Sequence, residues 1–119
     1  MKVAKFGGTS LASANQIKKV CSIVTSDPER RIVIVSAPGK RFKDDVKVTD
    51  MLIACANAGL EKGNADSELQ ALVDRFAEIA SELNVSDRVI EEIADDLRAR
   101  VDSDKSDKGK YMDCLKAAG

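Results

Sequence analysis

Two apolar runs with a capped helix between them open the chain, and this order restricts the fold more than any other feature. Val3–Phe6 is short and apolar, while Arg31–Ala37 is rich in β-branched residues and apolar on both faces. Such a run is typical of a buried strand in a parallel sheet. Ser13 and Gln16 have the spacing of a capping box, which predicts a helix that ends at Ser26-Asp27-Pro28. The order strand, helix, strand predicts an α/β fold with a parallel sheet.

Beyond residue 48 the hydrophobic pattern is helical, with apolar residues repeating at the i, i+3 and i+4 spacing of an amphipathic helix. Residues 40–47, just before it, are mostly charged and are expected to form a mobile surface loop. Two strands are few for an independent parallel sheet, so the fold looks incomplete. The expected helices run from a Thr49 cap to about Leu60, from Asp66 or Ser67 to Leu83, from Ser86 to Val101, and from about Lys108 to Ala118.

The segment Lys5-Phe6-Gly7-Gly8-Thr9-Ser10 joins the first strand to the helix and has the composition of a phosphate cradle. Glycines let main-chain N–H groups approach an anion, and a helix start adds further unpaired donors. Lys5 adds a full positive charge beside them. An ordinary tight turn is the alternative explanation, because Gly-Gly and Thr-Ser are common in loops.

Composition excludes several classes of function. The net charge is −1 and the aromatics are three Phe and one Tyr, which does not favour a nucleic-acid or membrane surface. No histidine is present, which excludes a Ser-His triad and most zinc sites. The three cysteines lack metal-type spacing and are expected to be reduced, as in a cytoplasmic protein. Phosphoryl transfer fits these residues, since it depends mainly on positioning and charge neutralisation.

Lys5-Phe6-Gly7-Gly8-Thr9-Ser10 resembles the N-terminal signature of the aspartate kinases, in the amino-acid-kinase superfamily. A second similarity lies at Ile32–Ala37, a strand that ends in Val-Ser-Ala and is followed by a loop and the pair Thr49-Asp50. The loop at 38–47 looks like the longer loop of one aspartate kinase subgroup. The resemblance implies the N-terminal part of an amino-acid-kinase-type parallel-sheet α/β/α sandwich, helix-rich after residue 48.

The resemblance also implies a reaction: transfer of the ATP γ-phosphoryl group to the side-chain carboxylate of L-aspartate, giving 4-phospho-L-aspartate. This is the first step toward lysine, threonine and methionine. ATP would come with Mg²⁺ as substrate, with no organic cofactor and no protein metal ligand assigned. Lys5 would be catalytic, and Ser36 and Thr49 would bind aspartate; otherwise they are a strand-end hydroxyl and a helix cap. The residues implied for the ATP phosphates are Lys5, Phe6, Gly7, Gly8, Thr9 and Ser10.

By the same resemblance, residues 1–119 are the N-terminal segment of an aspartate kinase catalytic domain, without the rest of that domain or the regulatory domains. Gly119 would be the glycine of a Gly-Glu step whose carboxylate contacts the amino-acid substrate. The isolated chain is therefore expected to be inactive, and the intact enzyme to be a homo-oligomer. Two alternatives stay open: a non-catalytic phosphate-binding or oligomerising fragment, or a related kinase acting on glutamate or acetylglutamate.

Overall fold

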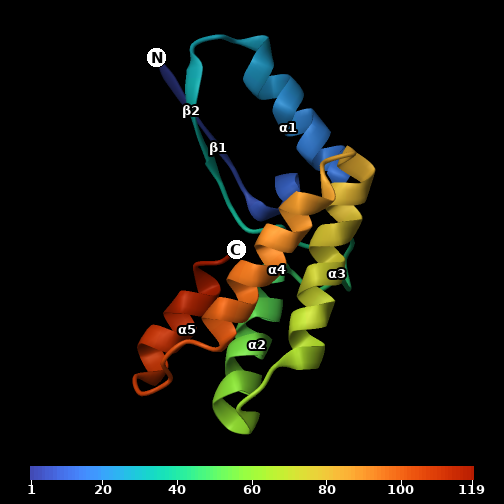
Figure 1. Cartoon of the computed structure of the whole chain (residues 1–119). Helices are drawn as coiled ribbons and strands as arrows, with labels where there is room; N and C mark the ends of the chain where they lie inside the picture. The colour runs from blue at the N-terminus through green and yellow to red at the C-terminus, as the bar shows by residue number, and fades with distance from the viewer. The chain divides into compact units, whose positions relative to one another are not determined.

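The structure, a computed structural model, describes residues 1–119 and divides into two compact units, Met1–Val48 and Thr49–Gly119. The first unit holds two parallel strands, β1 (Lys2–Phe6) and β2 (Arg30–Val35), joined through the helix α1 (Ala14–Ser26). Figure 1 shows α1 along one side of the strand pair. The predicted strand–helix–strand order is confirmed, and so is the helix start, where the Ser13 hydroxyl accepts a hydrogen bond from the Gln16 N–H at 3.4 Å.

The two strands are far more exposed than their apolar sequences predict. Ile34 is 48% exposed and Val35 is 59% exposed, and no residue of either strand is buried. The expectation of buried strands is wrong for this chain, because the sheet has only two strands and the chain supplies no others to pack beside them. The sheet therefore carries an apolar surface that water reaches.

An ion pair and a hydrogen bond join the start of β1 to the connection between α1 and β2. Lys2 Nζ lies 2.6 Å from the Asp27 carboxylate, and the Lys2 N–H donates to Glu29 O at 2.6 Å. The ammonium of Lys2, with the Glu29 N–H, holds the pKa of Asp27 below its usual value. These contacts fix the amino ends of both strands and leave their carboxyl ends to the loops.

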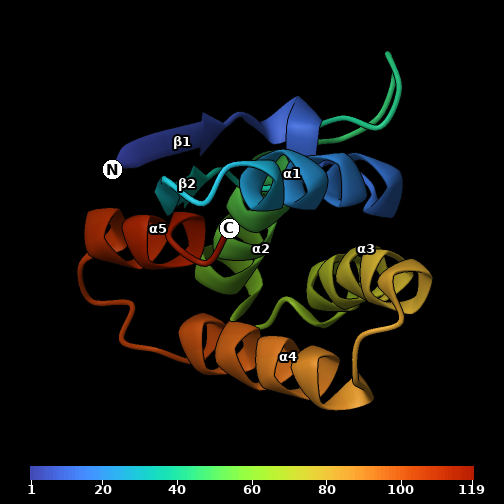
Figure 2. The same ribbon diagram turned by 90° about the horizontal axis from the view of Figure 1, so that it is seen from above.

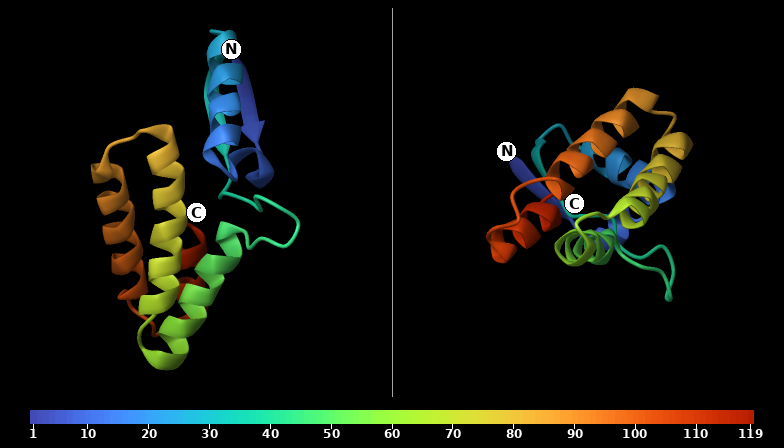
Figure 3. Two further views of the ribbon diagram at one scale, coloured as in Figure 1. Left: turned by 90° about the vertical axis from the view of Figure 1, so that its right-hand side faces the viewer. Right: turned by 60° about the horizontal axis from the view of Figure 1, so that its bottom comes forward.

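The second unit is made of four helices, α2 (Val48–Lys62), α3 (Asp66–Leu83), α4 (Asp87–Val101) and α5 (Lys108–Lys116). Figure 3 shows α3 and α4 side by side in opposite directions, as their short connection predicts. Asn84, in this connection, has the left-handed conformation (φ 56°) that ends a helix. Figure 2 shows the loop that carries the chain from α4 to α5.

A continuous core fills the second unit. Its largest fully buried side chains include Leu52, Leu72, Leu97, Leu115 and Tyr111. The Tyr111 hydroxyl donates to Val101 O at 2.7 Å, so the one polar atom of this aromatic side chain is satisfied inside the core. A Cβ on Gly59 would lie 2.2 Å from the same hydroxyl, and the absence of a side chain at Gly59 makes room for it.

Two predicted helix caps differ from the structure. Because α2 begins at Val48, Thr49 lies inside the helix and is not its N-cap. Ala65 is the N-cap of α3 without a side-chain hydrogen bond, so neither Asp66 nor Ser67 has that role. Ser86 does cap α4, with its hydroxyl accepting from the Arg88 N–H at 3.2 Å. None of the helices is long and apolar enough to cross a membrane.

Candidate phosphate site at the carboxyl ends of the strands

The segment after β1 folds as a tight turn. Gly7 is extended (φ −77°, ψ 172°), and a 3₁₀ turn, η1 (Gly8–Leu11), follows. A tight turn is the alternative that the sequence offers for this segment, but its 3₁₀ conformation was not predicted. The Ser10 N–H donates to Gly7 O at 3.1 Å, whereas the N–H groups of Gly8 and Thr9 donate to no other group of the chain. The turn therefore leaves two neighbouring main-chain donors free for an anion.

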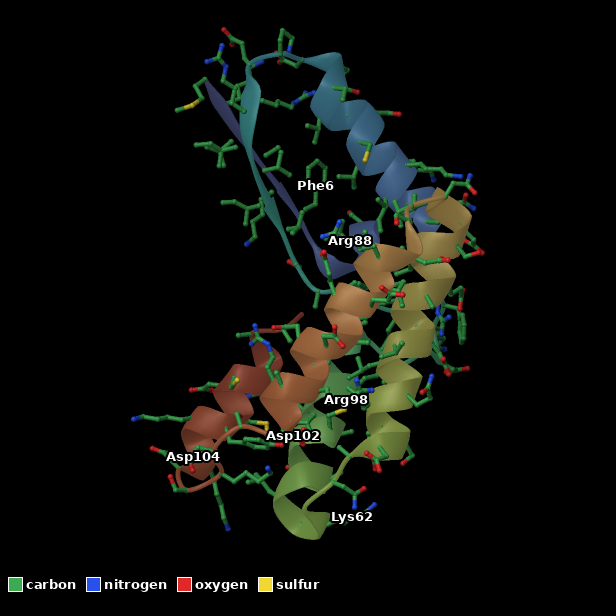
Figure 4. All side chains as sticks on the ribbon, in the orientation of Figure 1. Phe6, Lys62, Arg88, Arg98, Asp102 and Asp104 are labelled. Atoms are coloured by element: carbon green, nitrogen blue, oxygen red, sulfur yellow. The ribbon has the colours of Figure 1, made fainter.

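Lys5 lies two residues before Gly7, on the sheet face that α1 does not cover. Side chains alternate between the faces of a strand, so Phe6 points the opposite way. Figure 4 shows Phe6 between the strands and α1. Lys5 is exposed, and its ammonium makes no hydrogen bond or ion pair within the chain. Its charge is thus available to a ligand, in contrast to the charge of Lys2, which pairs with Asp27.

Ser36 lies at the same edge of the sheet. The strand pairing matches Phe6 with Val35, so Gly7 and Ser36 are the first residues beyond the two paired ends. Ser36 is partly exposed. The structure therefore brings Ser36 together with the glycine turn, at the carboxyl edge where open α/β sheets collect ligands.

Thr49 belongs to a different unit from the other predicted site residues. It lies in the first turn of α2 and belongs to the second unit, whereas Lys5, the glycine turn and Ser36 all belong to the first. Seven of the eight predicted site residues thus share one unit and one end of its sheet. These seven are Lys5, Phe6, Gly7, Gly8, Thr9, Ser10 and Ser36.

The charged loop has no regular structure, as expected, but it is braced from within. The Arg41 guanidinium donates to the Asp45 carboxylate at 2.6 and 2.9 Å, and the Arg41 N–H donates to it at 2.9 Å. These bonds hold the pKa of Asp45 far below its usual range. The Val48 N–H donates to Pro38 O at 2.9 Å and closes the base of the loop.

Sequence reasoning missed the contact between the two loops at this edge. It treats Pro38-Gly39 only as the end of a strand, but the Gly39 N–H donates to Gly8 O at 2.8 Å. The available signal was a second glycine just past the neighbouring parallel strand.

The structure contains no group of three or more acidic or cysteine side chains that is placed to hold a metal ion.

Comparison with known proteins shows the family to which the chain belongs. Residues 1–93 match the amino acid kinase family. Aspartokinase 3 of Bacillus subtilis is 53% identical over 119 residues, which are all of this chain and 26% of that protein. The crystal structure of Clostridium acetobutylicum aspartate kinase has a TM-score of 0.73 and 36% identity, and the alignment covers 92% of this chain and 25% of that one.

A second similar structure is a complex with ligands. It is E. coli aspartokinase III in complex with aspartate and ADP, with a TM-score of 0.73 and 28% identity over 98% of this chain and 25% of that one. The chain thus spans about a quarter of the length of these relatives. With two parallel strands and five helices, it matches part of the aspartate kinase fold. The chain belongs to the amino acid kinase family and is a homologue of the aspartokinases.

Proposed function

We propose that this chain carries the phosphate-binding part of an aspartate kinase, which transfers the γ-phosphoryl group of Mg-ATP to the side-chain carboxylate of L-aspartate. One observation carries the proposal: Lys5, whose ammonium has no partner in the chain, and the free amides of Gly8 and Thr9 belong to the same carboxyl edge of the sheet. Membership of the family and the aspartate and ADP bound by the E. coli relative support the choice of substrates.

The reaction has to bring two anions together. A carboxylate oxygen of aspartate attacks the γ-phosphorus, the bond from that phosphorus to the bridging oxygen of ADP breaks, and 4-phospho-L-aspartate and ADP leave. The carboxylate is already deprotonated at neutral pH, so the attack needs no general base. Lys5 neutralises the phosphoryl group during transfer, and the amides of Gly8 and Thr9 donate to phosphate oxygens. Groups fixed in this way favour the transition state without reorganising during the reaction.

Gly7 supports a ligand at this turn. A Cβ on Gly7 would meet no atom within 4 Å, and its φ of −77° suits any residue. Neither the conformation nor the packing of this chain requires a glycine there. A phosphate that approaches the main chain closely would require one.

Ser36 and Thr49 are proposed to hold aspartate. Ser36 lies at the correct edge of the sheet for this role, next to Gly7 in the strand pairing. Its hydroxyl can donate to a substrate carboxylate. The role of Thr49 is proposed from the resemblance to the family. Its hydroxyl is not used as the N-cap of α2, so capping does not compete with substrate binding.

We further propose that residues 1–119 are one segment of a catalytic domain and do not turn over alone, since they span about a quarter of the relatives. A coupled assay for ADP release with aspartate and Mg-ATP tests this. Turnover by the 119-residue chain in the range of about 1–100 s⁻¹, usual for kinases, would contradict it. ADP binding without turnover, even in the full-length gene product, would favour a non-catalytic phosphate-binding protein. The intact enzyme is proposed to be a cytoplasmic homo-oligomer.

Lys5→Ala in the full-length gene product tests the mechanism. We expect kcat to fall about 10²-fold or more, because a fixed charge at the transferring group is lost. The KM for aspartate should change much less, because the contact strengthens in the transition state. Lys5→Arg should restore little, since a planar guanidinium does not replace a compact ammonium.

Lys2→Ala is the matched control, because Lys2 lies on the same strand but pairs with Asp27. It should retain most of the activity. A Lys5→Ala enzyme with nearly normal kcat would remove Lys5 from the mechanism and leave only the glycine turn. Turnover with glutamate or acetylglutamate instead of aspartate would keep the mechanism and change the substrate.

A further inference from the structure

Gly39 and Gly8 form the closest contact between the two loops at the carboxyl edge of the sheet. The Gly39 N–H donates to Gly8 O at 2.8 Å. A Cβ on Gly39 would lie 2.7 Å from Gly8 C and 2.9 Å from both Gly8 O and Thr9 N. The atoms that it would strike belong to the peptide between Gly8 and Thr9, so the clash is with main chain and not with the end of a flexible side chain.

The main chain at Gly39 is held in place on the side away from Gly8. The Val48 N–H donates to Pro38 O at 2.9 Å and closes the loop directly behind Gly39. Pro38 and Gly39 are both buried. Inside the closed loop, the Arg41–Asp45 ion pair at 2.6 Å limits further adjustment. A side chain at Gly39 would therefore displace the Gly8–Thr9 peptide more readily than it would displace its own loop.

We propose that Gly39 is a positioning residue that sets the direction of the Thr9 N–H toward the phosphate groups of a nucleoside diphosphate or triphosphate. This inference rests on the proposed function, because it assigns a support to the same phosphate site. The displaced peptide carries the Thr9 N–H, one of the two free donors of the turn. Gly39 touches no phosphate itself and acts through Gly8.

The test compares two variants of the full-length gene product by titration calorimetry with Mg-ADP. Gly39→Ala should weaken ADP binding about tenfold or more, the range expected when a hydrogen bond to a charged group is lost. The kcat/KM for ATP should fall about 10²-fold, as displacements near 1 Å can cause. Gly109→Ala is the control, because its Cβ would meet only an ordinary contact, 3.4 Å from Asp107 Oδ1, inside α5.

A merely structural role for Gly39 predicts a different result. A partly unfolded population would lower the number of binding sites per chain and leave the Kd of the folded fraction unchanged. That result, or an unchanged Kd with full stoichiometry, would overturn the proposal.

Hydrogen–deuterium exchange on the unmodified protein gives a second measurement in case Gly39→Ala does not fold. Mg-ADP should slow exchange in a peptide that contains the Gly39 N–H, since its acceptor belongs to the phosphate turn; unchanged exchange would overturn the proposal. ADP binding without aspartate turnover would end the proposed function but keep this inference. Failure of the unmodified protein to bind ADP would end both.

Discussion

The two units of this chain bury their apolar side chains to very different degrees. In the second unit Leu72 and Tyr111 are almost fully buried, and its helices surround one core. In the first unit the strands remain exposed, with Val35 at 59%. The proposed chemistry lies in the less buried unit. A domain can thus keep its stable packing in one part and its ligand-binding edge in another, where open surface gives access.

The largest expected effect is a difference in stability between substitutions of apolar residues in the two units, and it tests whether the helices are better packed than the strands. Leu72→Ala should lower the free energy of unfolding by about 2–5 kcal/mol, the usual cost of a cavity in a packed core. Ile34→Ala in β2 should cost no more than about 1 kcal/mol, since Ile34 is 48% exposed. Urea denaturation followed by circular dichroism measures both changes. Equal costs would show that the strands are as well packed as the helices.

Self-association of the 119-residue chain is the next expected effect. Exposed apolar strands with unpaired edges rarely stay uncovered at high concentration. Ile34→Lys should weaken the association about tenfold or more, which corresponds to about 1.4 kcal/mol. Sedimentation velocity over a concentration series gives the mass. A monodisperse monomer at high concentration would contradict this prediction and would show that the exposed sheet tolerates water.

Tyr111→Phe examines the second unit more finely. It removes the hydroxyl that donates to Val101 O and leaves that carbonyl without this donor. The expected loss is about 1 kcal/mol, the typical net value of one hydrogen bond. Thermal unfolding measures it. A gain in stability would mean that the close approach of the hydroxyl to Gly59 costs more than the hydrogen bond contributes.

Acid should weaken the first unit by a smaller amount. Hydrogen bonds from Lys2 and Arg41 hold the pKa values of Asp27 and Asp45 below their usual values. A lowered folded-state pKa stabilises the fold above the unfolded value of about 3.9, and this stabilisation is lost as pH falls through the folded value. Carboxyl chemical shifts between neutral pH and pH 2 should show Asp27 titrating below the usual range for an aspartate, and Asp27→Asn should remove that titration.

The salt dependence of the carboxyl pKa values should differ between the two units. In the second unit the pKa of Asp104 is lowered mainly by the Ser106 N–H and hydroxyl, which are neutral donors. Added salt should therefore raise the pKa of Asp27 more than that of Asp104, because salt screens charge pairs. Equal shifts in salt would contradict the assignment of Lys2 as the main cause for Asp27.

Local signals in the sequence predicted the secondary structure well. The Ser13 hydroxyl caps α1 where its spacing with Gln16 predicts, because a cap depends on a few neighbouring residues. The burial of β2 was not predictable in the same way. Its apolar run indicates burial, but burial depends on several neighbouring strands, and the sheet of this chain has only β1 beside β2.

Motifs in the sequence select the candidate site residues, but they do not predict the contact that supports the turn. Lys5, the glycine turn and Ser36 follow from motifs, and the parallel pairing then places them at one edge. The contact between Gly8 and Gly39 depends on how two loops far apart in sequence meet. No local pattern encodes such a distance, because it follows from strand pairing and from the closing of the loop behind Gly39.

The hydrogen bond from the Val48 N–H to Pro38 O makes residues 40–47 a natural place for engineering. A segment that is closed at its base can be lengthened while the hydrogen bond between Val48 and Pro38 keeps the two ends of the loop together. Each doubling of its length would cost only about 0.6 kcal/mol in chain entropy. Phe42 is exposed, so a fluorescent reporter inserted next to it would lie in the loop whose Gly39 contacts Gly8, and its emission would test whether Mg-ADP binds at the proposed phosphate site.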